Sequence, residues 1–191
     1  RVGKTFLIEQ AFSEKTKYFL HVTGIQHAPM KDQLAEFAHA VSETFYPGIN
    51  IQAATSWLDA FRALTTAINA ISKRQKIVIF LDELPWLCSK RSRLLQALDY
   101  YWNHTWSKDK RITLIICGSS ASWIINKIIR NRGGLHNRVT QQILLKPFSL
   151  DEASTFCKSK HLNFTQRQLL ELTLFCGGIP FYLNDLKKGY S

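Results

Sequence analysis

The sequence lacks features that would assign it to several familiar classes of protein. No apolar run approaches the roughly 20 residues that a membrane-spanning helix needs, and no positively charged start leads into an apolar signal segment. There is also no C-x-x-C pair and no paired histidine spacing typical of a metal site. We therefore expect a cytoplasmic protein without membrane contact or structural zinc, whose four cysteines are free thiols.

Length and charge bound the remaining possibilities. With 191 residues, 46% of them hydrophobic, the chain is long enough for one domain with a full core and a small appendage. It carries 25 Lys and Arg against 14 Asp and Glu, a formal net charge of +11. Such an excess favours anionic partners, namely nucleotide phosphates, nucleic acid or acidic protein, and does not choose among them.

The order of apolar patterns predicts an α/β fold. Four short, β-rich apolar runs occur, at 17–24, 76–84, 111–120 and 141–148. Between them, apolar residues at helical spacing predict helices over 30–45, 56–71, 92–102 and 123–129. The middle two strands are continuous rather than alternating, as expected for strands buried on both faces of a parallel sheet.

The pattern changes after Pro147, where only helices are expected. Ser149 and Glu152 form the sequence of a capping box, in which each side chain satisfies a backbone donor at the start of a helix. Helical segments follow over 150–159, 165–175 and 179–187. We therefore predict an α/β core over residues 1–148 and a small helical appendage over residues 149–191.

The first six residues, RVGKTF, contain the end of a phosphate-binding loop, G-x-x-x-x-G-K-[ST], at Gly3, Lys4 and Thr5. The first glycine of the pattern and the strand before it would precede this sequence. Apolar spacing from Phe6 predicts a helix that begins at Lys4, so backbone N–H groups of this stretch would face phosphates. Lys4 would pair with the β- and γ-phosphates and the Thr5 hydroxyl would bind Mg²⁺. The alternative is a chance tripeptide.

The run IVIFLDE places two carboxylates, Asp82 and Glu83, at the end of a buried strand. Buried charges need partners, so this arrangement indicates chemistry more than stability. Asp82 can hold Mg²⁺, usually through water, and Glu83, on the other face of the pleat, can polarise an attacking water. The alternative is a solvated strand end with a helix-capping aspartate.

Two further segments carry candidate residues. The strand at 111–120 ends in small polar residues, and a hydroxyl of Ser119 or Ser120 could report the nucleotide state or cap the next helix. In the basic stretch 127–138, one Arg could reach a γ-phosphate across a subunit or domain boundary. The stretch could equally be a solvated loop or a nucleic-acid contact.

Together these segments resemble the P-loop ATPases of the AAA+ and STAND kind, and among them the prokaryotic archaeal-type ATPase family. The matching stretches are RVGKTFLI, IFLDELPWL, IICGSSAS, LHNRVTQQILLKPFSLDEA and GGIPFYL, and the resemblance covers nearly the whole chain. It implies a three-layer α/β/α fold with a mainly parallel sheet, whose first strand would precede residue 1. It also implies that the appendage over 149–191 is a helical lid.

The resemblance assigns roles to individual residues. The G-K-T tripeptide would bind phosphate and Mg²⁺, Asp82 would be the Mg²⁺-associated acid, and Glu83 the catalytic base. Ser119 is the best sensor candidate. Arg138 is the best candidate for an arginine that contacts the γ-phosphate or a subunit interface, and Pro180, in GGIP, marks the lid segment that approaches the nucleotide.

The function expected from these residues is Mg²⁺-dependent ATP hydrolysis that drives a conformational switch. Relatives typically continue into further domains, so a nucleic-acid or protein effector would act through a C-terminal part, and a nucleotide-dependent homo-oligomer is compatible with this scheme. The alternative function is a non-hydrolysing, nucleotide-gated scaffold or a DNA-binding module. A GTPase is less favoured, because Asn126-Lys127 is followed by Ile128-Ile129 and the base-reading N-K-x-D is absent.

Overall fold

The computed structural model describes residues 2–130, 135 and 138–186. The chain divides into two compact units, and each is described by itself. One unit comprises Ile8–Gln141, and the other combines Arg1–Leu7 with Gln142–Ser191. Among the described residues, no helix is both long enough and apolar enough to cross a membrane.

The larger unit is built on a three-stranded parallel sheet in the order β1 (Tyr18–Thr23), β2 (Ile77–Asp82) and β3 (Ile112–Ile116). All six residues of the central strand β2 are buried, as expected for the middle strand of a parallel sheet that is covered on both faces. Because the three strands are parallel, their carboxyl ends lie at the same end of the sheet. The predicted α/β fold with a parallel sheet is confirmed.

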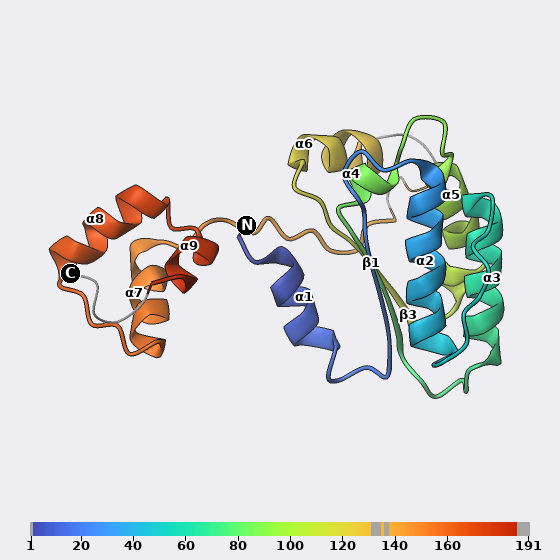
Figure 1. Ribbon diagram of the computed structural model, residues 1–191, viewed down its shortest axis with the longest axis horizontal. Coiled ribbons are helices and arrows are strands. Elements are labelled where there is room, and N and C mark those ends of the chain that lie inside the picture. The colour runs from blue at the N-terminus through green and yellow to red at the C-terminus, as the bar shows by residue number, and fades with distance from the viewer. Residues whose placement is uncertain (1, 131–134, 136–137, 187–191) are drawn as a thin grey trace. The chain divides into compact units, whose positions relative to one another are not determined.

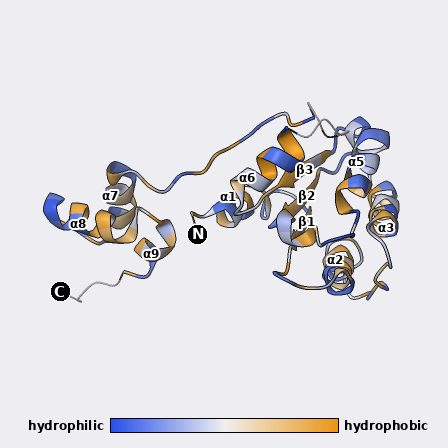
Figure 2. Ribbon diagram, turned by 90° about the horizontal axis from the view of Figure 1, so that it is seen from above, coloured by the Kyte–Doolittle hydropathy of each residue, from blue (hydrophilic) through white to orange (hydrophobic). Residues whose placement is uncertain are grey.

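Three amphipathic helices pack beside the sheet: α2 (Met30–Phe45), α3 (Trp57–Ala70) and α5 (Leu94–His104) (Figure 1). Hydrophobic residues run along the strands, whereas these helices carry both hydrophobic and hydrophilic residues (Figure 2). Between helices and sheet lies an aromatic cluster in which Phe61 contacts Phe37 and Trp106 edge to face, with ring centroids 5.6 and 5.2 Å apart. The Ser56 hydroxyl caps α3 by accepting a hydrogen bond from the Asp59 N–H.

Arg111, at the entrance to β3, ties the sheet to the end of α3. Its buried guanidinium donates to both carboxylate oxygens of Asp109, at 3.0 and 2.7 Å. It also donates to the carbonyls of Ile68, Ile71 and Ser72, at 3.4, 3.1 and 3.2 Å. Ile68 lies in the last turn of α3, Ile71 caps the helix and Ser72 follows it, so Arg111 binds carbonyls at and just beyond the helix end, where intrahelical donors run out. The hydrogen bond from Arg111 lowers the pKa of Asp109 below its ordinary value.

Short elements complete this unit. They are the end of α1 (Lys4–Phe12), α4 (Leu84–Leu87), the 3-10 turn η1 (Trp106–Lys108), α6 (Ala121–Ile124) and the π-helical turn η2 (Ile125–Ile129). The helix predicted over 123–129 is thus realised as two short pieces, which begin two residues earlier. All four cysteines are free.

The other unit contains three helices, α7 (Leu150–Ser159), α8 (Gln166–Cys176) and α9 (Pro180–Asn184), around a small core of their own. The predicted capping box is confirmed: the Ser149 hydroxyl accepts from the Glu152 N–H, and the Glu152 carboxylate accepts from the Ser149 N–H. The helix predicted over 179–187 ends at Asn184, and the last residue of that range lies outside the described part of the chain.

The prediction of a strand over 141–148 is wrong. This segment has no strand structure, and the side chains of Ile143 and Leu144 are 63% and 68% exposed. An apolar, β-prone stretch becomes a strand only when another strand pairs with its N–H and C=O groups. No strand pairs with it among the described residues; instead, the Phe148 N–H donates to the Gly178 carbonyl at 2.7 Å.

Candidate functional site

The candidate site is built where β2 and β3 end side by side. The ladder continues past both strands, because the Cys117 N–H donates to the Leu81 carbonyl at 3.0 Å and the Leu84 N–H to the Cys117 carbonyl at 2.9 Å. The residues that follow the two strands are therefore held next to one another. This places Ser119, which follows β3, beside Glu83, which follows β2.

Glu83 and Ser119 are joined by two hydrogen bonds. One carboxylate oxygen of Glu83, Oε2, accepts from the Ser119 N–H at 2.9 Å and from its hydroxyl at 2.8 Å. The adjacent Ser120 hydroxyl instead accepts from the Trp123 N–H at the start of α6. The sequence allows either serine to sense the nucleotide or to cap the next helix. In the structure, Ser120 is the residue that caps the helix. Ser119 contacts the carboxylate predicted to be the base, rather than Asp82.

Asp82 is the last residue of β2 and is only 3% exposed. Its Oδ1 accepts a hydrogen bond from the Glu83 N–H at 2.8 Å, which orients the carboxylate at the strand end. Glu83 itself has left-handed backbone angles, with φ 45° and ψ 47°. This conformation is uncommon for a residue with a side chain and concentrates at functional sites. It turns the chain out of the strand and into α4.

Gly24 and Gln33 support this turn, and no sequence pattern pointed to either residue. The Gly24 N–H donates to the Asp82 carbonyl at 2.9 Å, and a Cβ on Gly24 would lie 2.6 Å from the Glu83 carbonyl oxygen. Only glycine therefore fits beneath the Glu83 turn. The fully buried Gln33 amide accepts from the Ile25 N–H and donates to the carbonyls of Ile25 and Trp86. It thereby binds the loop after β1 to α4.

His21, on β1, contacts the same end of β2 and was also missed. Its ring stacks on Phe80 with centroids 4.6 Å apart, and its Nε2 lies 3.9 Å from Oδ2 of Asp82. The other ring nitrogen, Nδ1, lies 3.4 Å from the carboxylate of Glu9, in α1. Only the folded structure reveals these partners, because they are far from His21 in sequence.

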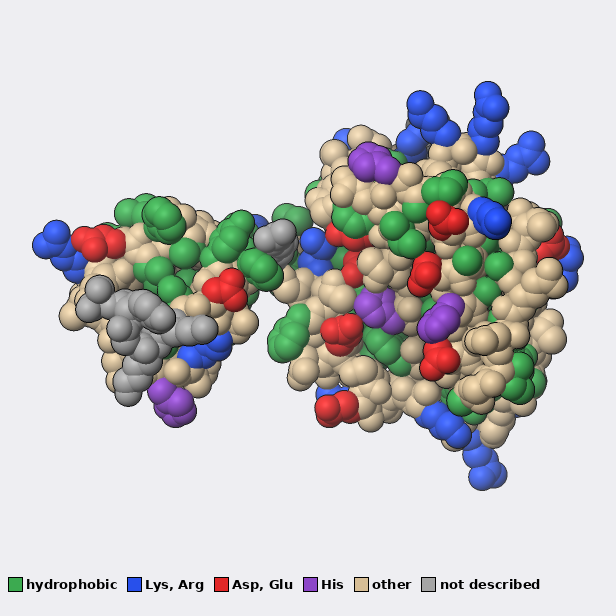
Figure 3. All heavy atoms as spheres, viewed as in Figure 1, with side chains coloured by type: hydrophobic (Ala, Val, Ile, Leu, Met, Phe, Trp, Pro, Cys, Tyr) green, Lys and Arg blue, Asp and Glu red, His purple; other side chains and the backbone are tan. Residues whose placement is uncertain are grey.

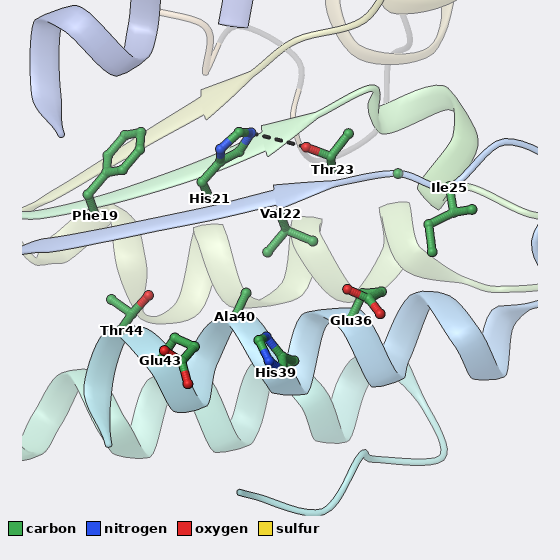
Figure 4. Close-up of a pocket in the computed structure, with 11 residues that line it drawn as sticks. Phe19, His21, Val22, Thr23, Ile25, Glu36, His39, Ala40, Glu43 and Thr44 are labelled. Atoms are coloured by element: carbon green, nitrogen blue, oxygen red, sulfur yellow. Dashed lines mark hydrogen bonds between the residues drawn. The ribbon is translucent and has the colours of Figure 1, made fainter. Parts of the chain in front are cut away.

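A cavity of about 490 Å³ lies along the edge strand β1 and the helix α2. Its lining includes His21, His39, Glu36 and Glu43, with Thr23 hydrogen-bonded to His21 at 3.1 Å (Figure 4). None of the residues predicted to bind nucleotide or metal lines this cavity. The candidate site is therefore the carboxyl end of β2 at Asp82 and Glu83, and not this cavity.

The G-K-T tripeptide stands at the beginning of α1, as predicted. Gly3 has φ +87°, in the left-handed region that glycine adopts without strain, and its carbonyl accepts the Leu7 N–H at 2.9 Å. Lys4 is the first residue of the helix, followed by Thr5 and by Phe6, which is 66% exposed. The backbone thus leaves a left-handed glycine directly into a helix, as a phosphate-binding loop does.

Two other predicted site residues, Arg138 and Pro180, lie outside the ends of β2 and β3. Arg138 is exposed, and its N–H donates to the Leu135 carbonyl at 3.2 Å. Of the other arginines in the basic stretch, Arg130 is described and exposed, whereas Arg132 lies outside the described residues. Pro180 is the first residue of α9, where its missing N–H costs no helix hydrogen bond.

The donors predicted for Mg²⁺ suit that ion chemically. Mg²⁺ takes oxygen ligands, and in nucleotide sites it usually binds one or two protein oxygens and completes its shell with phosphates and water. The Asp82 carboxylate and the Thr5 hydroxyl are donors of this kind. Within the described ranges, no group of three or more His, Cys, Asp or Glu side chains could hold a metal alone.

Comparison with known proteins identifies the family. A family model described as an ATPase domain predominantly from Archaea matches residues 1–186. The chain belongs to this ATPase family. Membership supports ATP binding and hydrolysis as the general activity of the domain.

Two individual proteins are similar to this chain. An uncharacterised protein of Methanocaldococcus jannaschii is 28% identical over 192 residues, which cover 98% of this chain and 37% of that protein. The Walker-type ATPase PABY2304 of Pyrococcus abyssi has a TM-score of 0.63 and 18% identity, covering 95% of this chain and 57% of that chain. This likeness shows a Walker-type ATPase fold. In both comparisons the chain spans less than two thirds of its relative.

Replacing Gln33 with Leu should destabilise the fold by about 1–3 kcal/mol, because the three hydrogen bonds of this buried amide to the backbone of Ile25 and Trp86 are lost. Chemical denaturation measures the change in the free energy of unfolding. Gln52 is exposed, so Gln52→Leu is the matched control, with an expected change within about 0.5 kcal/mol. Equal effects of the two substitutions would contradict the role assigned to the Gln33 amide.

Proposed function

We propose that the chain is the nucleotide-hydrolysing part of an ATPase in which Glu83 activates water for attack on the γ-phosphate of Mg²⁺-ATP. The observation that carries the proposal is the Glu83 carboxylate at the end of buried β2, fixed by two hydrogen bonds from Ser119. A carboxylate at a merely solvated strand end would not need hydrogen bonds that hold its side chain in one orientation. Membership of the ATPase family supports the same assignment.

In this proposal Asp82 and Thr5 hold Mg²⁺, and Lys4 pairs with the β- and γ-phosphates. The metal, when bound, neutralises charge that develops on the phosphate oxygens during transfer. Burial of Asp82 and its hydrogen bond from the Glu83 N–H keep the carboxylate in one orientation. The His21 ring lies close to both Asp82 and Glu9, so two carboxylates of the larger unit face it.

Glu83 acts as the general base in this scheme, and Ser119 is a positioning residue. Both Ser119 donors bind Oε2, and the other carboxylate oxygen, Oε1, has no hydrogen bond from any described residue. Oε1 is therefore the atom that can accept a proton from water while Oε2 stays fixed. The proton passes to Glu83 as the water oxygen attacks phosphorus and the bond to the β-phosphate oxygen breaks.

Hydrolysis would drive a conformational change through residues outside the strand edge. Arg138 is the candidate that stabilises charge on the γ-phosphate. Pro180 marks the lid segment that would respond when the γ-phosphate is lost. ATP hydrolysis, the general activity of the family, would supply the free energy for this motion, which would be passed to an effector or to a second copy of the protein.

Glu83→Gln should retain ATP binding and lower the turnover rate by at least about 100-fold, because an amide cannot accept the proton. Phosphate release with Mg²⁺ and binding of a fluorescent ATP analogue measure the two properties in protein of native length. Glu43→Gln, an acidic residue of the β1–α2 cavity, is the control and should leave both unchanged. Unaltered turnover in Glu83→Gln would contradict the proposal and favour a scaffold that does not use this carboxylate.

Ser119→Ala should lower kcat by about 10-fold while leaving the KM for ATP nearly unchanged, because it removes one of the two donors that orient Glu83. Ser120→Ala is the matched control, since it deletes a neighbouring hydroxyl that caps α6 instead. We expect it to reduce thermal stability slightly and to preserve kcat. If the two variants lose kcat to the same extent, Ser119 has no specific positioning role.

A further inference from the structure

Positive charge is concentrated in one part of the chain. Residues 84–150 contain eleven Lys and Arg side chains and only two carboxylates, Asp99 and Asp109. This segment therefore supplies nine of the eleven net positive charges of the whole sequence. Asp109 is already paired with Arg111, which leaves Asp99 as the remaining carboxylate of this part of the chain.

Three of these charges, with no carboxylate among them, lie in the loop between α4 and α5, called here the basic loop, Lys90–Arg93. Lys90, Arg91 and Arg93 are exposed, whereas Ser92 is buried and its N–H donates to the Ser89 carbonyl at 3.1 Å. Arg91 and Arg93 have left-handed φ angles of 66° and 53°. The loop is thus anchored through its serine and turns three cations outward.

These three cations have no ionic or hydrogen-bonding partner in the part of the chain that the structure describes. None of them forms an ion pair or a side-chain hydrogen bond there. Two left-handed arginines, separated by a single serine, are also unfavourable for the isolated backbone. The loop has an unfavourable backbone conformation, and its charged side chains are not paired within the described residues. Such side chains are available to bind an anion from solution.

The helix that follows extends the same surface with polar and aromatic groups. The exposed stripe of α5 consists of Gln96, Tyr100 and His104, which lie one turn apart on one face. The Tyr100 ring is 50% exposed and stacks on His104 with centroids 4.4 Å apart. The stripe itself contains no carboxylate. A row of cations therefore leads into an exposed stacked pair of rings.

The basic loop lies at the carboxyl end of the sheet, where the chain passes from β2 through α4 to α5 (Figure 1). Lys and Arg side chains gather and project on this end of the larger unit in the space-filling view (Figure 3). The exposed cations Lys73, Arg74 and Lys76 precede β2 and so lie at the opposite end of the same strand. The chain thus offers two clusters of equal charge at the two ends of β2.

We propose that the basic loop and the exposed stripe of α5 bind single-stranded nucleic acid. Lys90, Arg91 and Arg93 would contact successive phosphates, and an unpaired base would stack on Tyr100. Cations next to an exposed aromatic pair fit this ligand better than an acidic protein, because a base gives the rings a partner that a carboxylate does not. The proposal does not depend on ATP hydrolysis.

The test is binding of a fluorescein-labelled oligothymidylate, followed by anisotropy over a series of salt concentrations. The triple variant Lys90→Ala, Arg91→Ala, Arg93→Ala should bind at least about 10-fold more weakly and lower the slope of log K against log salt by about 2, since each phosphate contact on a single strand contributes about 0.7. The control Lys73→Ala, Arg74→Ala, Lys76→Ala removes the same charge and should bind within about twofold of wild type.

Tyr100→Leu tests the stacking part of the proposal and should weaken binding about 5-fold without changing the salt slope. Equal losses in the two triple variants would overturn the proposal, because binding would then follow net charge alone. Polyglutamate and unlabelled oligonucleotide are then compared as competitors. If polyglutamate displaces the labelled oligonucleotide at the same concentration of negative charge as the unlabelled oligonucleotide does, the proposal is overturned in favour of an acidic protein partner. Circular dichroism and ATP turnover, both expected to match wild type, separate these results from misfolding and from failure of the ATPase proposal.

Discussion

The left-handed turn at Glu83 is the constraint on which the candidate site depends. β2 is buried along its whole length, so its carboxylates can reach reactants only where the strand ends. The turn at Glu83 ends the strand, starts α4 and leaves the carboxylate facing the end of β3. Gly24 permits the close approach beneath it, and Ser119 fixes the side chain from across the ladder. An unfavourable backbone conformation is thus maintained by contacts from two neighbouring strands.

The rest of the larger unit holds these strand ends in place. Gln33 joins the loop after β1 to α4 through three hydrogen bonds, and Arg111 joins the start of β3 to the end of α3. Both are buried polar groups whose hydrogen bonds are made within the protein, which is the condition under which such groups specify one arrangement. The catalytic candidates therefore sit on short turns, while the precision of their placement comes from the sheet and the helices packed beside it.

Local patterns were sufficient to predict much of this structure. The helix over 30–45 and the strand run that ends at Asp82 follow from apolar spacing, and the capping box at Ser149 follows from two side chains three residues apart. Gly24, Gln33 and His21 could not be found in this way, because their roles come from contacts with residues more distant in sequence. The strand predicted over 141–148 fails for a related reason: a β-prone stretch does not carry its pairing partner within itself.

The most direct test of the account is a crystal structure of the native-length protein with Mg²⁺ and a non-hydrolysable ATP analogue. The account predicts Mg²⁺ next to Asp82, the γ-phosphate at the carboxyl end of β2 and β3, and a water between phosphorus and Oε1 of Glu83. Ser119 should still donate to Oε2. A nucleotide bound elsewhere, for example in the cavity between β1 and α2, or a Glu83 carboxylate turned away from the γ-phosphate, would contradict the assignment of Glu83 as the base.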